Sequence, residues 1–131
     1  MSRILVIDDD LLLLGTVERI LTSDGHEVAS ARDGHEGLER FRSGQFDLVA
    51  CDVSMPNMEG VKTIREIRGL CAALPLIAFT GHPASAAGPK PDMDALCIAG
   101  QLGGTETLAK PFRRQEFLAI VQRCLQSVAG S

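Results

Sequence analysis

Five polar residues follow or end short apolar runs in the sequence, and their side chains suit chemistry on a phosphoryl group. Asp8 and Asp9 follow one run, Asp52 follows another, Thr80 ends a third, and Lys110 follows the predicted strand 105–109. Carboxylates brought close together raise each other's pKa unless a cation neutralises them. Mg²⁺ prefers oxygen ligands and is commonly held by one or two carboxylates together with phosphate oxygens. We therefore predict a Mg²⁺ site if the fold brings these residues together.

The same residues predict a covalent reaction. A carboxylate beside a bound metal can act as a nucleophile toward phosphorus and form an aspartyl-phosphate. The metal, the ammonium of Lys110 and the hydroxyl of Thr80 would then share the charge on the phosphoryl oxygens. Gly81, directly after Thr80, leaves space for the incoming group.

Each of these residues also has a common structural explanation. The run of three Asp could be a solvated turn in which Asp10 caps the following helix. Asp52 could be a turn former, and Thr80 or Lys110 alone carries little information. Because all of them follow successive predicted strands, the joint pattern favours the functional interpretation.

Short apolar runs alternate with segments of helical periodicity along the chain. The sequence predicts strands over 4–7, 27–31, 46–51, 74–79 and 105–109, and helices over 11–21, 34–42, 61–70, 92–102 and 113–128. This alternation is typical of a parallel sheet with helices on both faces. We expect one α/β domain over residues 1–131, a flavodoxin-like doubly wound (βα)5 fold with strand order 2-1-3-4-5. Ligands of such folds bind beyond the carboxyl ends of the strands, where the five polar residues would meet.

Size, charge and composition exclude several classes of protein. The chain has 131 residues and a formal net charge of −4, which disfavours binding to nucleic acid or anionic lipid. It has no Trp or Tyr, whereas stacking platforms for single-stranded nucleic acid need exposed aromatic rings. No apolar run is long enough to span a bilayer, and the N-terminus lacks a signal-peptide pattern. We expect a cytoplasmic protein with no membrane or nucleic-acid partner of its own.

The four cysteines show no disulfide or metal-binding pattern. They are widely spaced, with no paired motif and no His at ligand spacing: Cys51, Cys71, Cys97 and Cys124. We expect reduced, mostly buried thiols. Cys51 precedes Asp52 on a predicted strand, so its side chain should point to the opposite face of the sheet.

Several motifs together resemble the receiver domain of two-component response regulators, especially the single-domain chemotaxis-type receivers. They are ILVIDDD at 4–10, FDLVACD at 46–52, MPNMEG at 55–60, TG at 80–81 and KPF at 110–112. The resemblance covers essentially the whole chain, and the combination of motifs is highly specific. It implies that Asp52 is the phosphoacceptor. It also implies that Asp8, Asp9, Asp52 and the backbone carbonyl of Ser54 hold Mg²⁺.

The resemblance implies further roles around the acceptor. Thr80 would be the switch hydroxyl that bonds a phosphoryl oxygen. Lys110 would pair with Asp52 before phosphorylation and with the phosphoryl group afterwards. Met55-Pro56 and Gly60 would shape the neighbouring loop, and the Lys110–Pro111 peptide bond is expected to be cis.

The implied function is that of a phosphoacceptor module in a two-component or phosphorelay system. A sensor histidine kinase or a histidine phosphotransferase would donate the phosphoryl group from a phosphohistidine. Phosphorylation would switch a surface formed by helix four, strand five and helix five, which would bind a downstream protein. Such a protein is a signalling module that assists its own phosphorylation and dephosphorylation rather than an enzyme. With no output domain after its last helix, the chain would act as a stand-alone receiver or be a domain excised from a larger protein.

The sequence departs from the family pattern at three places. Thr107 stands three residues before the lysine, where the family usually has Tyr or Phe, so the usual aromatic readout is in doubt. Lys110 lies 30 positions after Thr80, which is longer than usual, and the segment 83–91 is rich in Pro and Gly. It could be a tolerated loop insertion or a partner-specific surface. Ser54 and His82 would flank the phosphoryl group and tune its lifetime, although a loop His is more often simply exposed.

Two alternatives remain open at the level of sequence. One is a docking module that keeps the fold but has lost the switch, which Thr107 favours and the intact set of polar residues opposes. The other is a small Mg²⁺-dependent aspartyl-phosphate phosphatase of the haloacid dehalogenase kind. Only the spacing of Asp8 and Asp10 supports that enzyme, and the chain has no room for a cap domain.

Overall fold

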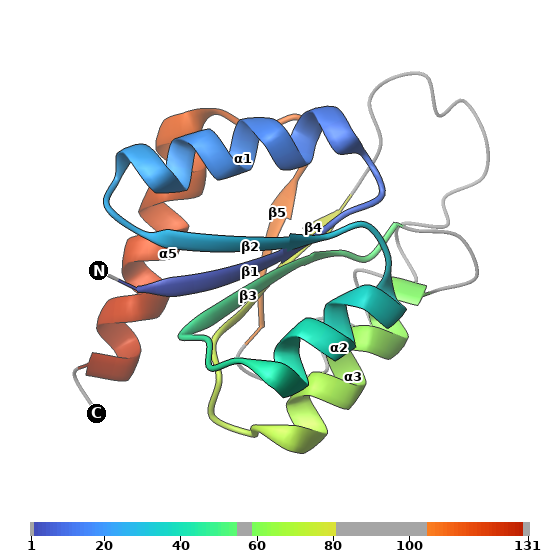
Figure 1. The fold of residues 1–131 in the computed structure, drawn as a ribbon. Helices are drawn as coiled ribbons and strands as arrows, with labels where there is room; N and C mark the ends of the chain where they lie inside the picture. The colour runs from blue at the N-terminus through green and yellow to red at the C-terminus, as the bar shows by residue number, and fades with distance from the viewer. Residues whose placement is uncertain (1, 55–58, 81–104, 130–131) are drawn as a thin grey trace.

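The computed structural model describes residues 2–54, 59–80 and 105–129 (Figure 1). These residues contain a five-stranded parallel sheet in the order β2-β1-β3-β4-β5, which confirms the predicted order. The strands are β1 (Arg3–Ile7), β2 (Glu27–Ala31), β3 (Leu48–Asp52), β4 (Leu76–Thr80) and β5 (Thr105–Ala109). The helices are α1 (Leu11–Ser23), α2 (Gly34–Ser43), α3 (Glu59–Leu70) and α5 (Arg114–Ala129).

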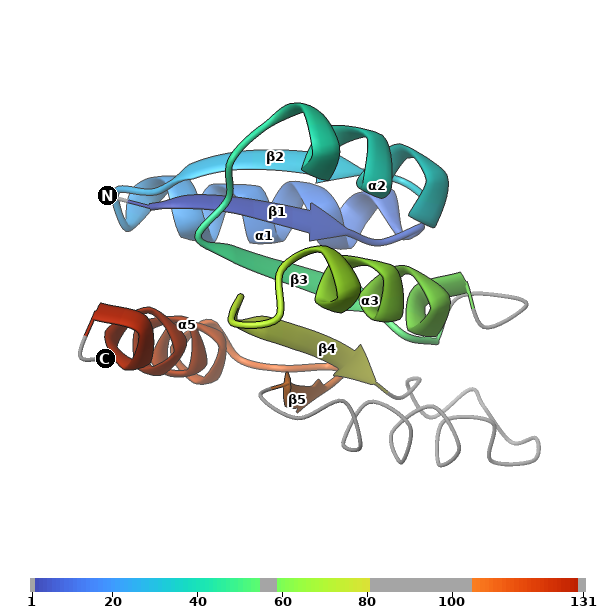
Figure 2. The ribbon, with the colours of Figure 1, turned by 90° about the horizontal axis from the view of Figure 1, so that it is seen from below.

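Two hydrophobic layers hold the helices on the sheet. In β1, Ile4 and Val6 point toward α1 and α5, whereas Leu5 and Ile7 point toward α2 and α3. This alternation follows from the two-residue period of a strand, and burial on both faces explains why the strand is apolar throughout. Figure 2 shows α2 and α3 lying side by side on one face, with β1, β3 and β4 ending at the same edge. That edge is where the predicted site residues lie.

The helix beginnings beside this edge follow from local hydrogen bonds. Asp10 caps α1, as predicted, because its Oδ1 accepts hydrogen bonds from the backbone amides of Leu12 at 3.1 Å and Leu13 at 3.2 Å. Asp33 caps α2 by accepting from the amide of Glu36 at 2.8 Å. These caps determine the residues at which α1 and α2 begin after β1 and β2.

Several predicted boundaries were wrong by a few residues. The strand predicted over 46–51 begins at Leu48 and includes Asp52, because Asp47 pairs with Arg3 through its amide and its side chain outside the ladder. The strand predicted over 74–79 begins at Leu76, after a turn in which Leu74 N–H bonds to Cys71 O, and it includes Thr80. The third helix begins at Glu59 rather than residue 61. Smaller differences of one or two residues affect the other helices, as is usual at helix ends.

Other predictions gave a mixed outcome. Cys51 and Cys124 are buried, but Cys71 is exposed because it lies in the turn after α3. Thr107 is on β5 with its side chain exposed. The helix predicted over 92–102, the Pro- and Gly-rich segment 83–91, and Met55-Pro56, Gly81, His82 and Cys97 lie outside the described residues.

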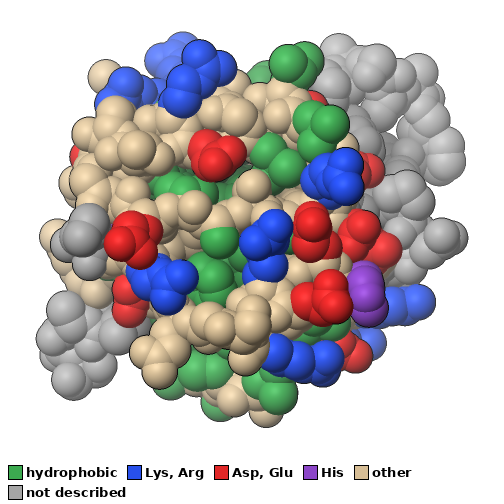
Figure 3. All heavy atoms as spheres, in the orientation of Figure 1, with side chains coloured by type: hydrophobic (Ala, Val, Ile, Leu, Met, Phe, Trp, Pro, Cys, Tyr) green, Lys and Arg blue, Asp and Glu red, His purple; other side chains and the backbone are tan. Residues whose placement is uncertain are grey.

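Basic and acidic side chains are interspersed over the face shown in Figure 3. Ion pairs such as Arg3–Glu27 at 3.2 Å and Arg40–Glu36 at 3.8 Å join exposed or half-exposed side chains and contribute little to stability. No helix in the described part of the chain is long and apolar enough to cross a membrane.

Candidate functional site

Three carboxylates meet where β1 and β3 end. One ligand oxygen each from Asp8, Asp9 and Asp52 lies within 4.8 Å of the others. Asp8 is fully buried and Asp52 is 3% exposed, whereas Asp9 is exposed. The parallel pairing of β1 with β3 explains this approach, because it aligns Ile7 with Cys51 and so brings the following residues together. The predicted acidic cluster therefore exists in the fold.

Hydrogen bonds from neighbouring backbone amides orient the two buried carboxylates. Asp8 Oδ1 accepts from the amide of Asp10 at 2.9 Å, and Asp52 Oδ1 accepts from the amide of Ser54 at 2.8 Å. Each local bond occupies Oδ1. The Oδ2 atoms of both carboxylates then face the side chain of Lys110.

Lys110 places its ammonium between the two buried carboxylates. Its Nζ lies 2.8 Å from Asp8 Oδ2 and 3.2 Å from Asp52 Oδ2. The resemblance predicted the contact with Asp52, but the shorter contact with Asp8 was not predicted. The amide of Lys110 also donates to Thr80 O at 2.8 Å, and the following peptide bond to Pro111 is cis, as the resemblance implied.

Aromatic side chains form the floor beside this lysine. Phe79, which precedes Thr80 on β4, stacks on Phe112 with ring centroids 5.2 Å apart, and both rings contact Phe117 of α5. Lys110 Nζ lies 6.0 Å from the centroid of the Phe79 ring, at the limit of a cation–π contact. Buried packing therefore restricts where the ammonium can move.

Burial and charge shift two pKa values in the site. Burial raises the pKa of Asp8 from 3.8 to about 6, with the charge of Asp52 adding to this and hydrogen bonds from Lys110 and Asp10 opposing it. Burial lowers the pKa of Lys110, but its hydrogen bonds and attraction to Asp8 and Asp52 outweigh that effect and raise it above its ordinary value. The ammonium stays charged, and the ionised form of Asp8 is destabilised.

Replacing Asp8 with Asn is expected to stabilise the protein in metal-free buffer at pH 7.5. A group whose pKa is raised on folding contributes stability below its unfolded pKa and loses it as pH rises through the folded value. For Asp8 that loss falls between pH 3.8 and about 6. One pKa unit corresponds to about 1.4 kcal/mol, so the rise of the Asp8 pKa from 3.8 to about 6 predicts that the free energy of unfolding increases by about 3 kcal/mol at pH 7.5 and changes little near pH 4. Urea denaturation at both pH values measures this.

Asp9→Asn provides the control, because that side chain is exposed. It should change the stability much less than Asp8→Asn does. If the wild-type and Asp8→Asn proteins are equally stable at pH 7.5, burial does not destabilise the ionised carboxylate of Asp8.

The donor set fits a hard divalent cation. The cluster holds three carboxylates against one ammonium, so an additional positive charge would relieve their repulsion. Its donors are oxygens, which Mg²⁺ prefers, and the exposed Asp9 opens the cluster to solvent. Asp8, Asp9 and Asp52 could hold the ion.

The remaining predicted residues lie around this cluster to different extents. Thr80 is the last residue of β4 and is 5% exposed, and it pairs with Ala109, directly before Lys110. Ser54 lies two residues after the end of β3 and is half-buried. The two described histidines contact carboxylates outside the cluster, with His26 Nε2 3.5 Å from Asp24 and His35 Nε2 3.9 Å from Glu39.

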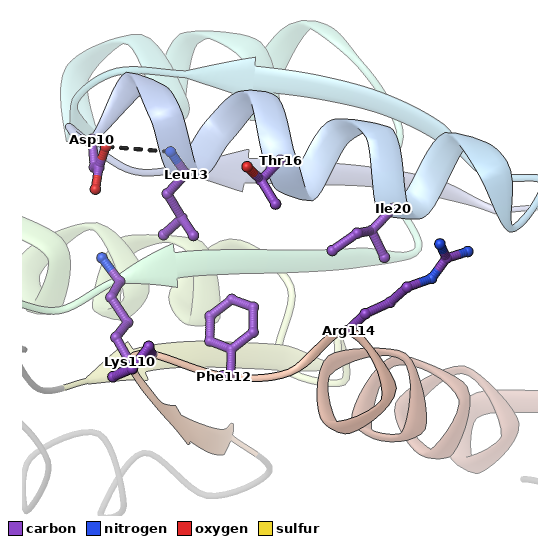
Figure 4. A pocket seen from close by; sticks show the side chains of 8 residues that line it. Asp10, Leu13, Thr16, Ile20, Lys110, Phe112 and Arg114 are labelled. Carbon is purple, nitrogen blue, oxygen red and sulfur yellow. Dashed lines mark hydrogen bonds between the residues drawn. The ribbon is translucent and has the colours of Figure 1, made fainter.

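Sequence reasoning missed a pocket beside Lys110. It has a volume of about 350 Å³, and Figure 4 shows side chains of α1 facing those of the segment before α5. Its lining is Asp10, Leu13, Thr16, Ile20, Lys110, Pro111, Phe112 and Arg114. Lys110 lies 90 positions after Ile20, so no local pattern could have indicated the pocket.

Comparison with known proteins gives a consistent result. The family model described as "Response regulator receiver domain" matches residues 4–122. The chain is 32% identical over 122 residues to the transcriptional regulatory protein ZraR of Escherichia coli K12, covering 93% of this chain and 26% of ZraR. It is 33% identical over 125 residues to the response regulator MprA of Mycobacterium tuberculosis H37Rv, covering 95% of this chain and 50% of MprA. The chain thus spans between a quarter and a half of these relatives.

Solved structures share the same architecture. A response regulator receiver domain protein from Clostridium thermocellum superposes with a TM-score of 0.86 at 30% identity, covering 98% of both chains. A CheY-like receiver domain protein from Methanospirillum hungatei gives a TM-score of 0.84 at 25% identity, covering 97% of this chain and 95% of that one. The similarity extends over the whole sheet and its helices.

Proposed function

The chain belongs to the response regulator receiver domain family, and from this premise we propose that it is a phosphoacceptor module with Asp52 as the acceptor. The observation that carries the proposal is the position of Lys110 Nζ, within 3.2 Å of both Asp8 and Asp52 inside a cluster of three carboxylates. Such a cluster combines a nucleophile, a cation-binding set and a fixed positive charge. Those are the groups that phosphoryl transfer to a carboxylate needs.

In the proposed reaction, one carboxylate oxygen of Asp52 attacks the phosphorus atom of a phosphohistidine. A P–O bond to Asp52 forms as the P–N bond to the donor imidazole breaks, and the imidazole leaves with that electron pair and takes up a proton. Lys110 would move its hydrogen bond from Asp52 to a phosphoryl oxygen, and Thr80 would donate its hydroxyl hydrogen to another. The amide of Ser54, which donates to Asp52 Oδ1, orients the acceptor.

Mg²⁺ is the proposed cofactor. Asp8, Asp9, Asp52 and the backbone carbonyl of Ser54 would hold it. When bound, the ion supplies positive charge that offsets the charge of the carboxylates and of the incoming phosphoryl oxygens.

The proposed partners follow from this chemistry and from the family. The donor would be a sensor histidine kinase or a histidine phosphotransferase. A downstream protein would bind the surface that contains β5 and α5. The family usually has an aromatic residue at the position of Thr107, which is exposed on β5 and cannot replace that buried ring. The hydroxyl of Thr80 would therefore signal through other contacts. We also propose a cytoplasmic location, where reduced thiols such as Cys51 are stable.

Intact-mass spectrometry after incubation with acetyl phosphate tests the proposal. The wild-type protein should gain one phosphoryl group with Mg²⁺ and none with EDTA, and Asp52→Asn should gain none under either condition. Binding of Mg²⁺ without any adduct, from acetyl phosphate or a phosphorylated histidine phosphotransferase, would favour the docking-module alternative. Continuous release of phosphate from a phosphomonoester would instead favour a phosphatase.

A further inference from the structure

We propose that Glu59 is a positioning residue for the acceptor Asp52, acting through a hydrogen bond to the start of α2. Glu59 Oε1 accepts from the amide of Gly34 at 2.9 Å, although the two residues are 25 positions apart. The inference rests on the proposed phosphoacceptor function. Glu59 would act indirectly, because it touches neither the proposed Mg²⁺ nor the phosphoryl group.

The hydrogen bond to Gly34 is well placed energetically. Gly34 is the first residue of α2, so its amide has no partner within its own helix. A carboxylate is favourable at a helix N-terminus, and hydrogen bonds with one charged partner are stronger than neutral ones. Glu59 therefore joins the start of α3 to the start of α2.

The start of α2 packs closely against α3 beside this hydrogen bond. A Cβ atom on Gly34 would collide with Thr63 Oγ1 and lie 2.9 Å from Glu59 Cγ. The Thr63 hydroxyl in turn donates to Glu59 O at 2.8 Å, and Thr63 is buried. The backbone of Gly34 thus rests directly on the first turn of α3.

The same turn contacts the acceptor. A Cβ atom on Gly60 would overlap the carbonyl oxygen of Asp52 and lie 2.8 Å from the Asp52 carbonyl carbon. The thiol of Cys51 lies 3.5 Å from Asp52 O and 3.8 Å from Gly60 O, within reach of both as a hydrogen-bond donor. The peptide group that carries Asp52 therefore packs against the residue directly after Glu59.

These contacts form a continuous path from α2 to the acceptor. Glu59 holds Gly60 in place, and Gly60 supports the Asp52 peptide group. Asp52 is the last residue of β3 and Glu59 is the first residue of α3. Removing the Glu59 hydrogen bond should loosen both the Asp52 carboxylate and the Ser54 carbonyl, so that the Mg²⁺ ligands are less well ordered.

The test measures Mg²⁺ affinity by isothermal titration calorimetry at a temperature well below the unfolding midpoint of each variant. Glu59→Met keeps the length of the side chain but removes the acceptor oxygen, and it should weaken Mg²⁺ binding about 10-fold, as for other groups that orient metal ligands. Glu59→Gln keeps an oxygen acceptor, although without the charge, and should retain most of the wild-type Mg²⁺ affinity. Glu59→Ala serves as a second truncation if the Met variant does not fold.

Glu36→Met is the matched control. Glu36 Oε1 accepts from the amide of Arg32 at 2.7 Å, so this variant also loses a carboxylate-to-amide bond near the start of α2. Glu36 has no contact with the α3 turn among the described interactions, and its loss should lower stability without changing Mg²⁺ affinity.

Three outcomes would overturn the inference. If Glu59→Gln is as weak as Glu59→Met, the carboxylate charge rather than the hydrogen bond matters. If Glu59→Met binds Mg²⁺ as tightly as the wild type, or if Glu36→Met is equally impaired, the contact does not position the site. In all three, the wild type still binds Mg²⁺ and gains a phosphoryl group. A wild type that does neither overturns the proposed function itself and the inference with it.

Discussion

Replacing Lys110 with Met is expected to slow phosphorylation by acetyl phosphate at least 100-fold and to strengthen Mg²⁺ binding. The rate should fall because removing one hydrogen-bond donor to a developing oxyanion costs about 10²- to 10³-fold. The ammonium lies 2.8 Å from Asp8 and 3.2 Å from Asp52, so it competes with a metal ion for the same two carboxylates. Without it the carboxylates attract Mg²⁺ more strongly, but the phosphoryl oxygens lose a partner. The opposite signs of the two effects separate the role of Lys110 from a general loss of structure.

The rate of adduct formation and a Mg²⁺ titration on the same preparations measure both effects. Lys62→Met is the control, because Lys62 is an exposed lysine on α3 outside the cluster. It should leave rate and affinity unchanged. A parallel fall in rate and Mg²⁺ affinity in Lys110→Met would show that Lys110 mainly orders the carboxylates, contrary to the proposed role.

Replacing Gly60 with Ala is expected to lower the free energy of unfolding by about 3 kcal/mol, at the upper end of the cost of overpacking a closely packed site. The added Cβ would overlap the Asp52 carbonyl oxygen and lie 2.8 Å from both the Asp52 carbonyl carbon and Val53 Cα. These are backbone atoms of a central strand and its end, and they cannot rotate away as a side chain can. The start of α3 must therefore move, and Asp52 moves with it.

Gly69→Ala is the control within the same helix. No atom lies within 4 Å of a Cβ built on Gly69, which is exposed near the end of α3. Alanine there should raise stability by about 0.5–1 kcal/mol, because it lowers the entropy of the unfolded chain and favours helix. Urea denaturation of both variants measures the difference. If Gly60→Ala is as stable as the wild type, the close contact between α3 and the end of β3 does not exist in solution.

The residues of the site could be predicted because local patterns mark the strand ends. Apolar runs before Asp8, Asp52 and Thr80 predict buried parallel strands, and parallel strands with right-handed crossovers bring their carboxyl ends to one edge. The strand before Lys110 is more polar, with the sequence TETLA. The exact strand beginnings were harder to predict. Phe46 continues the apolar pattern but lies outside β3, because the pairing of Asp47 with Arg3 precedes the ladder.

The amino-acid sequence by itself determined the strand order, the edge at which the polar residues gather and the acidic character of the cluster. Only the tertiary structure decided which oxygen bonds which donor. Lys110 lies 102 positions from Asp8 along the chain, and its closer approach to Asp8 than to Asp52 depends on how β5 and the rings beside it pack. The contact of Glu59 with Gly34 likewise depends on the distance between α2 and α3. Periodicity reports which face of an element is buried, but contacts between distant elements depend on packing to within an ångström or so.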